Sequence, residues 1–314
     1  MNENLEKVNQ ALKLINQRIL GKEEVVKEIM LTILAEGHVL LIDIPGVGKT
    51  TLVKSFAQVL GLTSKRVSFS NDTMPADLTG FSIYSPKDQE FHYQEGAIFA
   101  NIFLADEINR TSPKTQAALL EAMEEGSVSV EGETRLLPQP FIVLATENPL
   151  GSVGTQPLPE AQVDRFMVSL SMGYPDLESE IYLIKEAKHL NDALTNLLDV
   201  EAVEKAIEDV KNIYVSDELY EYAVKLVRES RDNPLLTLGA SPRASLALIK
   251  LAKASAYLND RDFITPADLQ KQYPFVMKHR LVLSNRARSD GMNIEDVINN
   301  LLKSVKAPRI GLKR

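Results

Sequence analysis

The sequence predicts an α/β domain built on a buried parallel sheet, followed by an all-helical domain. In the first part, continuous apolar runs at 38–42, 102–105 and 141–145 alternate with helical patterns, as expected for strands that are covered on both faces. In the second part, apolar residues recur at helical spacing, and no convincing strand pattern is present. We therefore expect one domain at 1–175 and a second at 176–314.

The elements of the first part follow from local patterns. Leu5, Val8, Leu12 and Ile15 recur at the spacing of an amphipathic helix. Ser112-Pro113 combines an N-cap with a first-turn proline. We predict helices over 3–18, 22–35 and 50–60 and from 113 onward, a further strand over 66–70, and a small hairpin over 128–137.

The second part is predicted to contain helices only. Ser241-Pro242 and Thr265-Pro266 each read as an N-cap followed by a proline in the first turn. The predicted helices lie near 177–190, 200–210, 217–230, 242–258, 266–271 and 293–303.

The composition restricts the class of protein. The chain of 314 residues carries 35 Lys and Arg against 43 Asp and Glu, a net charge of −8, which argues against general binding of nucleic acid. It contains no cysteine, so disulfides and thiolate metal sites are excluded, and its 4 histidines are scattered without metal-ligand spacing. With neither a secretion signal nor an apolar run long enough to span a bilayer, we expect a cytoplasmic protein.

The segment 44–51 matches most of a phosphate-binding loop. A strand pattern precedes it and a helix pattern follows, so backbone N–H groups at the helix start would surround phosphates. Lys49 would bind the β- and γ-phosphates of ATP, and the Thr50 hydroxyl would coordinate Mg²⁺. The general pattern has glycine at position 43, where this chain has Asp43. The expected nucleotide-binding residues are Pro45, Gly46, Val47, Gly48, Lys49, Thr50 and Thr51.

Two acidic residues follow the apolar run at 102–105. Carboxyl ends of parallel strands are where α/β sheets bind ligands. We expect Asp106 to hold Mg²⁺, directly or through water, and Glu107 to orient or deprotonate the attacking water. Asn148, after the run at 141–145, is placed to contact the γ-phosphate or that water, although its local pattern alone favours a simple Asn-Pro turn.

These motifs together resemble the MoxR family of AAA+ ATPases. The most specific phrases are GHVLLIDIPGVGKTTL, GAIFANIFLADEINRTSPKTQAALLEAMEE, FIVLATENP and LPEAQVDRF, and the likeness runs from about Ile19 to the end of the chain. The resemblance implies an AAA+ core, a helical lid, and a homo-oligomeric ring of six subunits with active sites between them.

The resemblance also implies roles that local pattern does not give. Asn148 corresponds to the sensor in the strand that follows the two acidic residues. Arg165 corresponds to the arginine finger that reaches a neighbouring subunit's site, and Arg243 to a second sensor in the lid. Leu20 and Gly21 correspond to the adenine-side element, in which Lys22 replaces the usual glutamine. Residues 77–94 resemble an insertion within the second helix of the core that projects towards the pore or the client.

The function implied is ATP hydrolysis coupled to the remodelling, maturation or activation of a client protein, often with a partner that carries a von Willebrand factor A domain. Alternatives within the same branch are a DNA-dependent motor and a motor subunit of the magnesium-chelatase type. The acidic charge argues against the first alternative. A scaffold that binds ATP without turnover is the non-catalytic alternative, and the presence of Glu107 argues against it.

Overall fold

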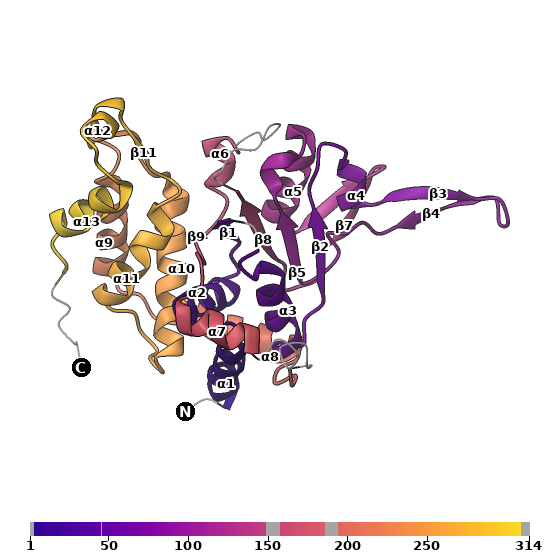
Figure 1. Cartoon of the computed structure of the whole chain (residues 1–314), viewed down its shortest axis with the longest axis horizontal. Coiled ribbons are helices and arrows are strands. Elements are labelled where there is room, and N and C mark those ends of the chain that lie inside the picture. Colours follow the sequence, from indigo (N-terminus) through magenta and orange to yellow (C-terminus); the bar gives the residue numbers. More distant parts are fainter. Residues whose placement is uncertain (1–2, 45, 149–157, 186–193, 309–314) are drawn as a thin grey trace.

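A five-stranded parallel sheet lies at the centre of the computed structural model, which describes residues 3–44, 46–148, 158–185 and 194–308. The strand order is β2-β5-β8-β1-β9 (Figure 1). The strands are β1 (Val39–Ile42), β2 (Ser64–Ser68), β5 (Ile102–Asp106), β8 (Ile142–Glu147) and β9 (Val168–Leu170). The predicted parallel sheet is confirmed, with β2 two residues earlier than expected and β9 as an unpredicted fifth strand.

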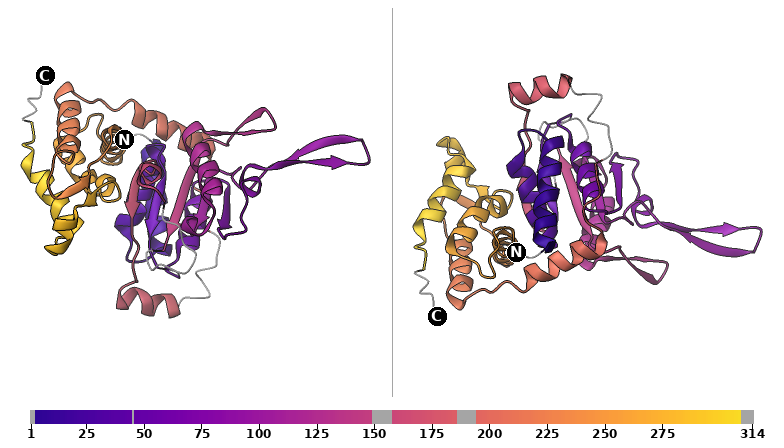
Figure 2. Two further views of the ribbon diagram at one scale, coloured as in Figure 1. Left: turned by 90° about the horizontal axis from the view of Figure 1, so that it is seen from above. Right: turned by 90° about the horizontal axis from the view of Figure 1, so that it is seen from below.

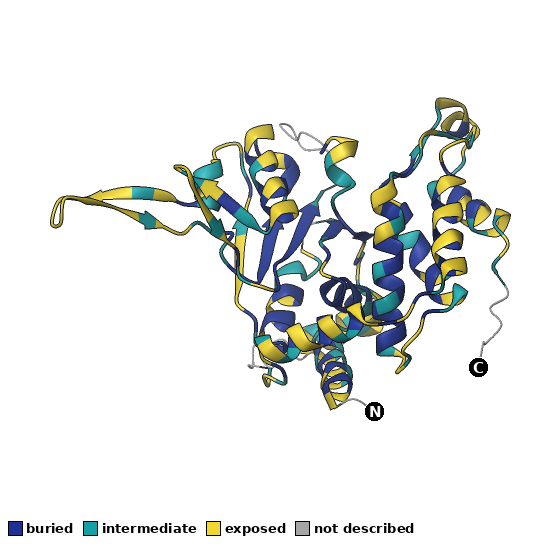
Figure 3. Cartoon of the chain, turned by 180° about the vertical axis from the view of Figure 1, so that it is seen from behind, coloured by how far each residue is buried: buried dark blue, intermediate teal, exposed yellow. Residues whose placement is uncertain are grey.

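Both faces of the sheet are covered, which explains the continuous apolar runs. On β1, Val39 and Leu41 belong to one apolar cluster and Leu40 to the other. Helices from both parts of the chain pack into the first cluster, and α4 and α5 pack into the second (Figures 1 and 3). The core helices are α1 (Glu3–Arg18), α2 (Glu23–Leu34), α3 (Lys49–Val59), α4 (Pro75–Thr79) and α5 (Pro113–Glu125), with the 3₁₀ helix η1 at Ile108–Arg110.

Two antiparallel hairpins extend from the core. The longer hairpin, β3 (Phe81–Ser85) with β4 (Glu90–Gln94), projects far from the sheet (Figures 1 and 2). The shorter is β6 (Ser127–Val130) with β7 (Glu133–Leu136), as predicted. The Arg135 guanidinium lies 3.7 Å from the centre of the Tyr93 ring, which holds the base of the long hairpin against the short one. The range 77–94, predicted to be an insertion, therefore contains the end of the short helix α4 followed by the hairpin.

The C-terminal part is helical, as predicted, apart from one small sheet (Figure 2). Strands β10 (Leu236–Leu238) and β11 (Val282–Leu283) pair antiparallel and were not predicted. The helices from residue 158 onward are α6 (Glu160–Val163), α7 (Leu177–Lys185), α8 (Val200–Lys211), α9 (Asp217–Arg228), α10 (Pro242–Leu258), α11 (Pro266–Met277), α12 (Asn285–Ser289) and α13 (Ile294–Ser304).

One apolar cluster joins the two parts of the molecule. It contains residues of α1, α2 and α3 as well as residues of α8 to α11 and α13. The sequence boundary near 175 therefore does not divide the hydrophobic core, although the division into domains at 1–175 and 176–314 stays a prediction. Within the described ranges, the helices are all too short or too polar to cross a bilayer.

Candidate active site

The loop between β1 and α3 has the backbone conformation that phosphate binding requires. Gly46 and Gly48 have φ of 86° and 91°, a region that residues with a Cβ rarely adopt. Gly48 is the N-cap of α3 and has no side chain, so it leaves the first N–H groups of the helix for a ligand. The Lys49 ammonium donates to the Asp43 carbonyl at 3.2 Å. Pro45 lies outside the described residues.

The two carboxylates at the end of β5 are held in different ways. Asp106 Oδ2 pairs with Arg66 at 2.7 Å, and Glu107 Oε2 pairs with Arg110 at 2.7 Å. Glu107 adopts φ 58°, which is uncommon for a residue other than glycine, and this turn separates its side chain from that of Asp106.

Thr146 connects both carboxylate residues to β8. Its side chain is fully buried, its hydroxyl donates to Asp106 Oδ1 at 2.7 Å, and its Oγ1 accepts from the Glu107 N–H at 2.8 Å. The Thr146 hydroxyl thus fixes the carboxylate of Asp106 and the backbone of Glu107. Sequence analysis did not identify Thr146, because no motif marks a residue that acts through a neighbouring strand.

A cavity of about 330 Å³ brings most of the predicted catalytic residues together. Arg66 and Ser68 of β2 also line it, and neither was predicted. Arg66 belongs to a strand that the sequence did predict, but its place beside Asp106 depends on the order of the strands in the sheet. The lining residues are Gly46, Gly48, Lys49, Thr50, Arg66, Ser68, Asp106, Glu107 and Asn148.

The oxygen atoms at this cavity suit Mg²⁺. The described residues include no group of three or more His, Cys, Asp or Glu side chains that could hold a metal ion alone. Mg²⁺ usually retains waters and binds one or two protein oxygens together with substrate phosphates. The Thr50 hydroxyl and the Asp106 carboxylate, which both line the cavity, are hard oxygen ligands of this kind.

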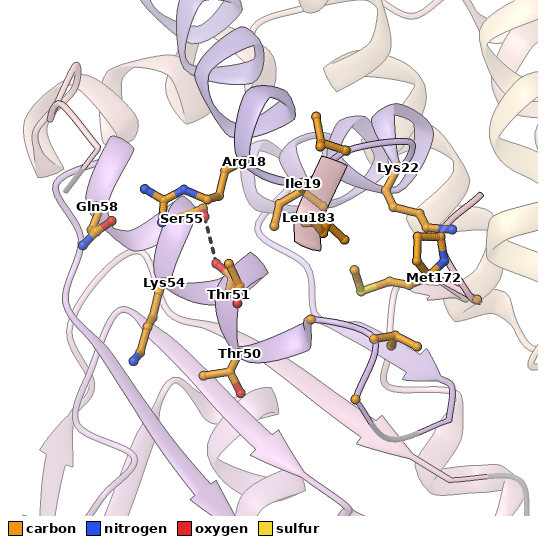
Figure 4. A pocket seen from close by; sticks show the side chains of 16 residues that line it. Arg18, Ile19, Lys22, Thr50, Thr51, Lys54, Ser55, Gln58, Met172 and Leu183 are labelled. Atoms are coloured by element: carbon orange, nitrogen blue, oxygen red, sulfur yellow. Dashed lines mark hydrogen bonds between the residues drawn. The ribbon is translucent and has the colours of Figure 1, made fainter. Parts of the chain in front are cut away.

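A larger cavity, of about 430 Å³, also borders the phosphate loop (Figure 4). Ile19, Leu20, Met172 and Leu183 give it apolar walls, while Lys54 and Arg18 add charge. Its size and mixed lining are typical of a small-molecule site. Its lining includes Val47, Thr51 and Leu20, three of the residues that the sequence predicts to bind nucleotide.

Gly21 lies next to this cavity rather than in its lining. Its φ is 66°, and a Cβ there would lie 2.9 Å from Ser179 Oγ. The glycine therefore allows α7 to approach the loop that carries Leu20 and Lys22.

Arg165 and Arg243 lie together, away from the phosphate loop. Both pair with Glu124, the first at 3.1 Å. With Arg280 they line a separate cavity of about 250 Å³, which shares no residue with the two cavities beside the loop. Arg165 and Arg243 thus lie beside each other, but they do not share a cavity with Lys49 of the same chain.

Arg280 holds the segment that carries Arg165. It is only 5% exposed, its Nε pairs with Asp164 at 2.7 Å, and its guanidinium also donates to the carbonyls of Phe166 and Met167 at 2.7 and 3.1 Å. Burial lowers the pKa of Arg280, and the Asp164 carboxylate opposes that shift. Sequence analysis missed this residue, because a buried arginine after a helix end has no local signature.

Comparison with known proteins identifies the family of this chain. Residues 38–168 match the family described as the ATPase family associated with various cellular activities (AAA), and residues 228–301 match an AAA lid domain. YeaC of Bacillus subtilis is 45% identical over 303 residues, covering 96% of this chain and 95% of YeaC. Chaperone MoxR1 of Mycobacterium tuberculosis is 38% identical, covering 94% of this chain and 81% of MoxR1.

A crystal structure of a proposed ATPase from Cytophaga hutchinsonii matches with a TM-score of 0.91 and 32% identity, covering 98% of this chain and 96% of that one. Core and lid are thus matched in the order that the sequence predicts, and the likeness to MoxR1 extends over most of both chains. On this basis the chain is an ATP hydrolase that belongs to the MoxR family of AAA+ ATPases.

Proposed function

We propose that this chain hydrolyses ATP with Mg²⁺ in a homo-oligomeric ring of six copies and uses the energy to remodel a client protein. The observation that carries the ring is the separation of the catalytic residues into two cavities. Lys49 and Glu107 line one cavity, whereas Arg165 and Arg243 line another that shares no residue with it. Arg165 therefore serves the nucleotide of a neighbouring copy, and Arg243 acts as the second sensor of the lid.

Each residue at the loop has a distinct role in this proposal. Lys49 binds the β- and γ-phosphates, and Thr50 and Asp106 hold Mg²⁺, which neutralises phosphate charge when bound. Glu107 orients the attacking water and takes its proton, and Asn148 contacts the γ-phosphate or the water. Arg165 of the neighbouring copy stabilises the charge that develops on the transferred group, a contribution of about 10³–10⁵ in rate in arginine-finger enzymes.

The proposal that the chain remodels a client protein rests on its similarity to a relative. A relative that covers most of this chain is named a chaperone, which supports the remodelling of a protein. A von Willebrand factor A domain protein is the partner class that we propose to test first, by its effect on the ATPase rate.

Subunit mixing tests the shared site. Glu107→Gln and Arg165→Ala should each abolish turnover while ATP still binds. Mixed in equal amounts, the two variants should recover activity, because roughly one interface in four then combines an intact Glu107 with an intact Arg165. The ATPase rate per subunit of the wild type should also rise with protein concentration.

Arg286→Ala is the matched control, because the Arg286 side chain is 90% exposed and outside all three cavities. Its rate should equal that of the wild type. A mixture that stays inactive, together with a wild-type rate per subunit that is independent of concentration, would refute the shared site and leave a single-subunit ATPase.

A further inference from the structure

Asp43 occupies the position where the general phosphate-loop pattern has glycine, and its side chain makes specific contacts. It is 4% exposed, directly after β1. Its carboxylate accepts hydrogen bonds from the backbone N–H groups of Ile44 at 3.1 Å, of Gly173 at 3.1 Å and of Met172. A buried carboxylate is costly unless it is hydrogen-bonded, and these three donors meet that requirement.

The need for this acceptor follows from the sheet. Strands β1 and β9 are parallel neighbours, with Val39 opposite Val168 and Leu41 opposite Leu170. Beyond these residues the two segments diverge. The segment after β1 enters the phosphate loop, and the segment after β9 leads to α7. The Asp43 carboxylate accepts hydrogen bonds from the N–H groups of Met172 and Gly173. These bonds link the two segments beyond the ends of β1 and β9. A glycine at 43 would remove this acceptor and leave the N–H groups of Met172 and Gly173 without their side-chain partner.

The segment 172–175 forms a wall of the 430 Å³ cavity. Met172, Gly173 and Pro175 line it, together with the loop residues Gly46 and Val47. When the phosphates of a nucleotide bind at the loop, its base would occupy this cavity, because the cavity adjoins the loop and has apolar walls.

A second side chain holds the same segment. The Lys22 ammonium donates to the Tyr174 carbonyl at 2.9 Å, and Lys22 lines the cavity near Met172 (Figure 4). Asp43 and Lys22 are the two positions at which the sequence departs from the usual phosphate-loop and adenine-side patterns. Both departures contact the segment 172–174.

We propose that Asp43 is a positioning residue for the base of the nucleotide: its carboxylate fixes the wall at 172–173 relative to the phosphate loop. The inference rests on ATP binding at that loop. Removal of the carboxylate's acceptor atoms should therefore weaken contacts to the base and leave contacts to the phosphates nearly intact.

Calorimetric titration of the full chain with ATP and with inorganic tripolyphosphate separates these contacts. Asp43→Ala removes both acceptor oxygens, so the N–H groups of Met172 and Gly173 lose their side-chain partner and the wall loses part of its support. We expect the Kd of ATP to rise by about 10-fold while that of tripolyphosphate changes less than about two-fold. The KM for ATP should rise with the Kd, and kcat should change by less than about three-fold.

Asp262→Ala is the matched control, because Asp262 is exposed and lines none of the three cavities. Lys22→Met removes the hydrogen bond to the Tyr174 carbonyl without changing the interior of the sheet. It should also weaken the binding of ATP more than the binding of tripolyphosphate. The proposal would be overturned if both variants bound ATP and tripolyphosphate equally more weakly, or if neither variant bound ATP more weakly than the wild type. A wild-type protein that bound neither ligand would instead contradict ATP binding itself.

Discussion

A single buried hydroxyl, that of Thr146, contacts both acidic residues at the end of β5. Thr146→Val keeps the shape of the side chain but removes the donor to Asp106 and the acceptor for the Glu107 N–H. We expect kcat to fall by about 100-fold, because a small displacement of Glu107 misplaces the attacking water. The KM for ATP should change much less, since Lys49 and the loop are untouched.

Thr146→Ser is the matched control, because it keeps the hydroxyl and loses only a methyl group. Steady-state ATPase assays of both variants at equal protein concentration are the measurement. Recovery of most of the wild-type kcat by serine would separate the hydroxyl's role from a packing defect. If valine is as active as the wild type, Thr146 does not position Glu107.

Residues within one continuous motif were predicted, and residues that act across the sheet were not. Lys49 and Thr50 could be identified because the glycine turn, the lysine and the helix start are adjacent in sequence. Thr146 and Arg66 contact Asp106 only because β8 and β2 flank β5. Strand order depends on the whole chain, so local pattern does not reveal such partners.

At the scale of elements, the end of α11 is joined to the segment that carries Arg165. Arg280 is buried and pairs with Asp164, so removing its charge leaves a carboxylate in a largely buried position. We expect Arg280→Met to lower the free energy of unfolding by about 3–5 kcal/mol, as for other broken buried pairs. Urea denaturation at fixed protein concentration measures this loss.

Lys278→Met is the matched control on the same helix end. Lys278 pairs with Glu295 at 2.7 Å, but both side chains are about half exposed, at 47% and 54%. Exposed pairs contribute about 0–1 kcal/mol, so this variant should unfold almost as the wild type does. Equal losses in the two variants would mean that burial of Arg280 does not decide its contribution.

Long periodic elements were predicted more reliably than short ones. Strand β9 has three residues, and β11 has two, too few to show an alternating pattern. Helix α11 continues to Met277, although Pro274 lies inside it and favoured an earlier end. The predicted helix near 177–190 is confirmed for Leu177–Lys185, and 186–193 lie outside the described residues.

At the scale of the whole molecule, one of the two apolar clusters runs from the sheet into the C-terminal helices and joins the two parts of the chain. Within this junction lies a buried acid, Glu28 of α2, which is 0% exposed. Gln272 of α11 donates to its Oε1 at 3.3 Å, whereas Oε2 has no hydrogen-bond partner in the part of the chain that the structure describes. Burial raises the pKa of Glu28 to about 7, and the Gln272 hydrogen bond and the charges of Lys27 and Lys271 oppose that shift.

This raised pKa predicts how the stability of the whole molecule depends on pH. Because the folded pKa of about 7 exceeds the ordinary value of 4.5, the folded state retains a proton that the unfolded state has lost between these two values. The wild type should therefore lose stability as pH rises through this window, by about 3 kcal/mol in total. Glu28→Gln cannot ionise, so its advantage over the wild type should grow across the window and stay constant above it.

Urea denaturation at intervals from pH about 5 to about 8 gives the difference between the two proteins directly, and other titrating groups cancel in that difference. Glu23→Gln, an exposed change in the first turn of α2, should differ from the wild type by a constant of less than about 0.5 kcal/mol, because Glu23 is not among the charges that shift the pKa of Glu28. Parallel pH profiles for Glu28→Gln and the wild type would show that Glu28 is ionised in the folded protein. The junction would then have to supply a cation or water to that carboxylate. Growth of the difference would instead establish that Glu28, between the sheet and the helical part, stays protonated in the folded protein at pH values below about 7.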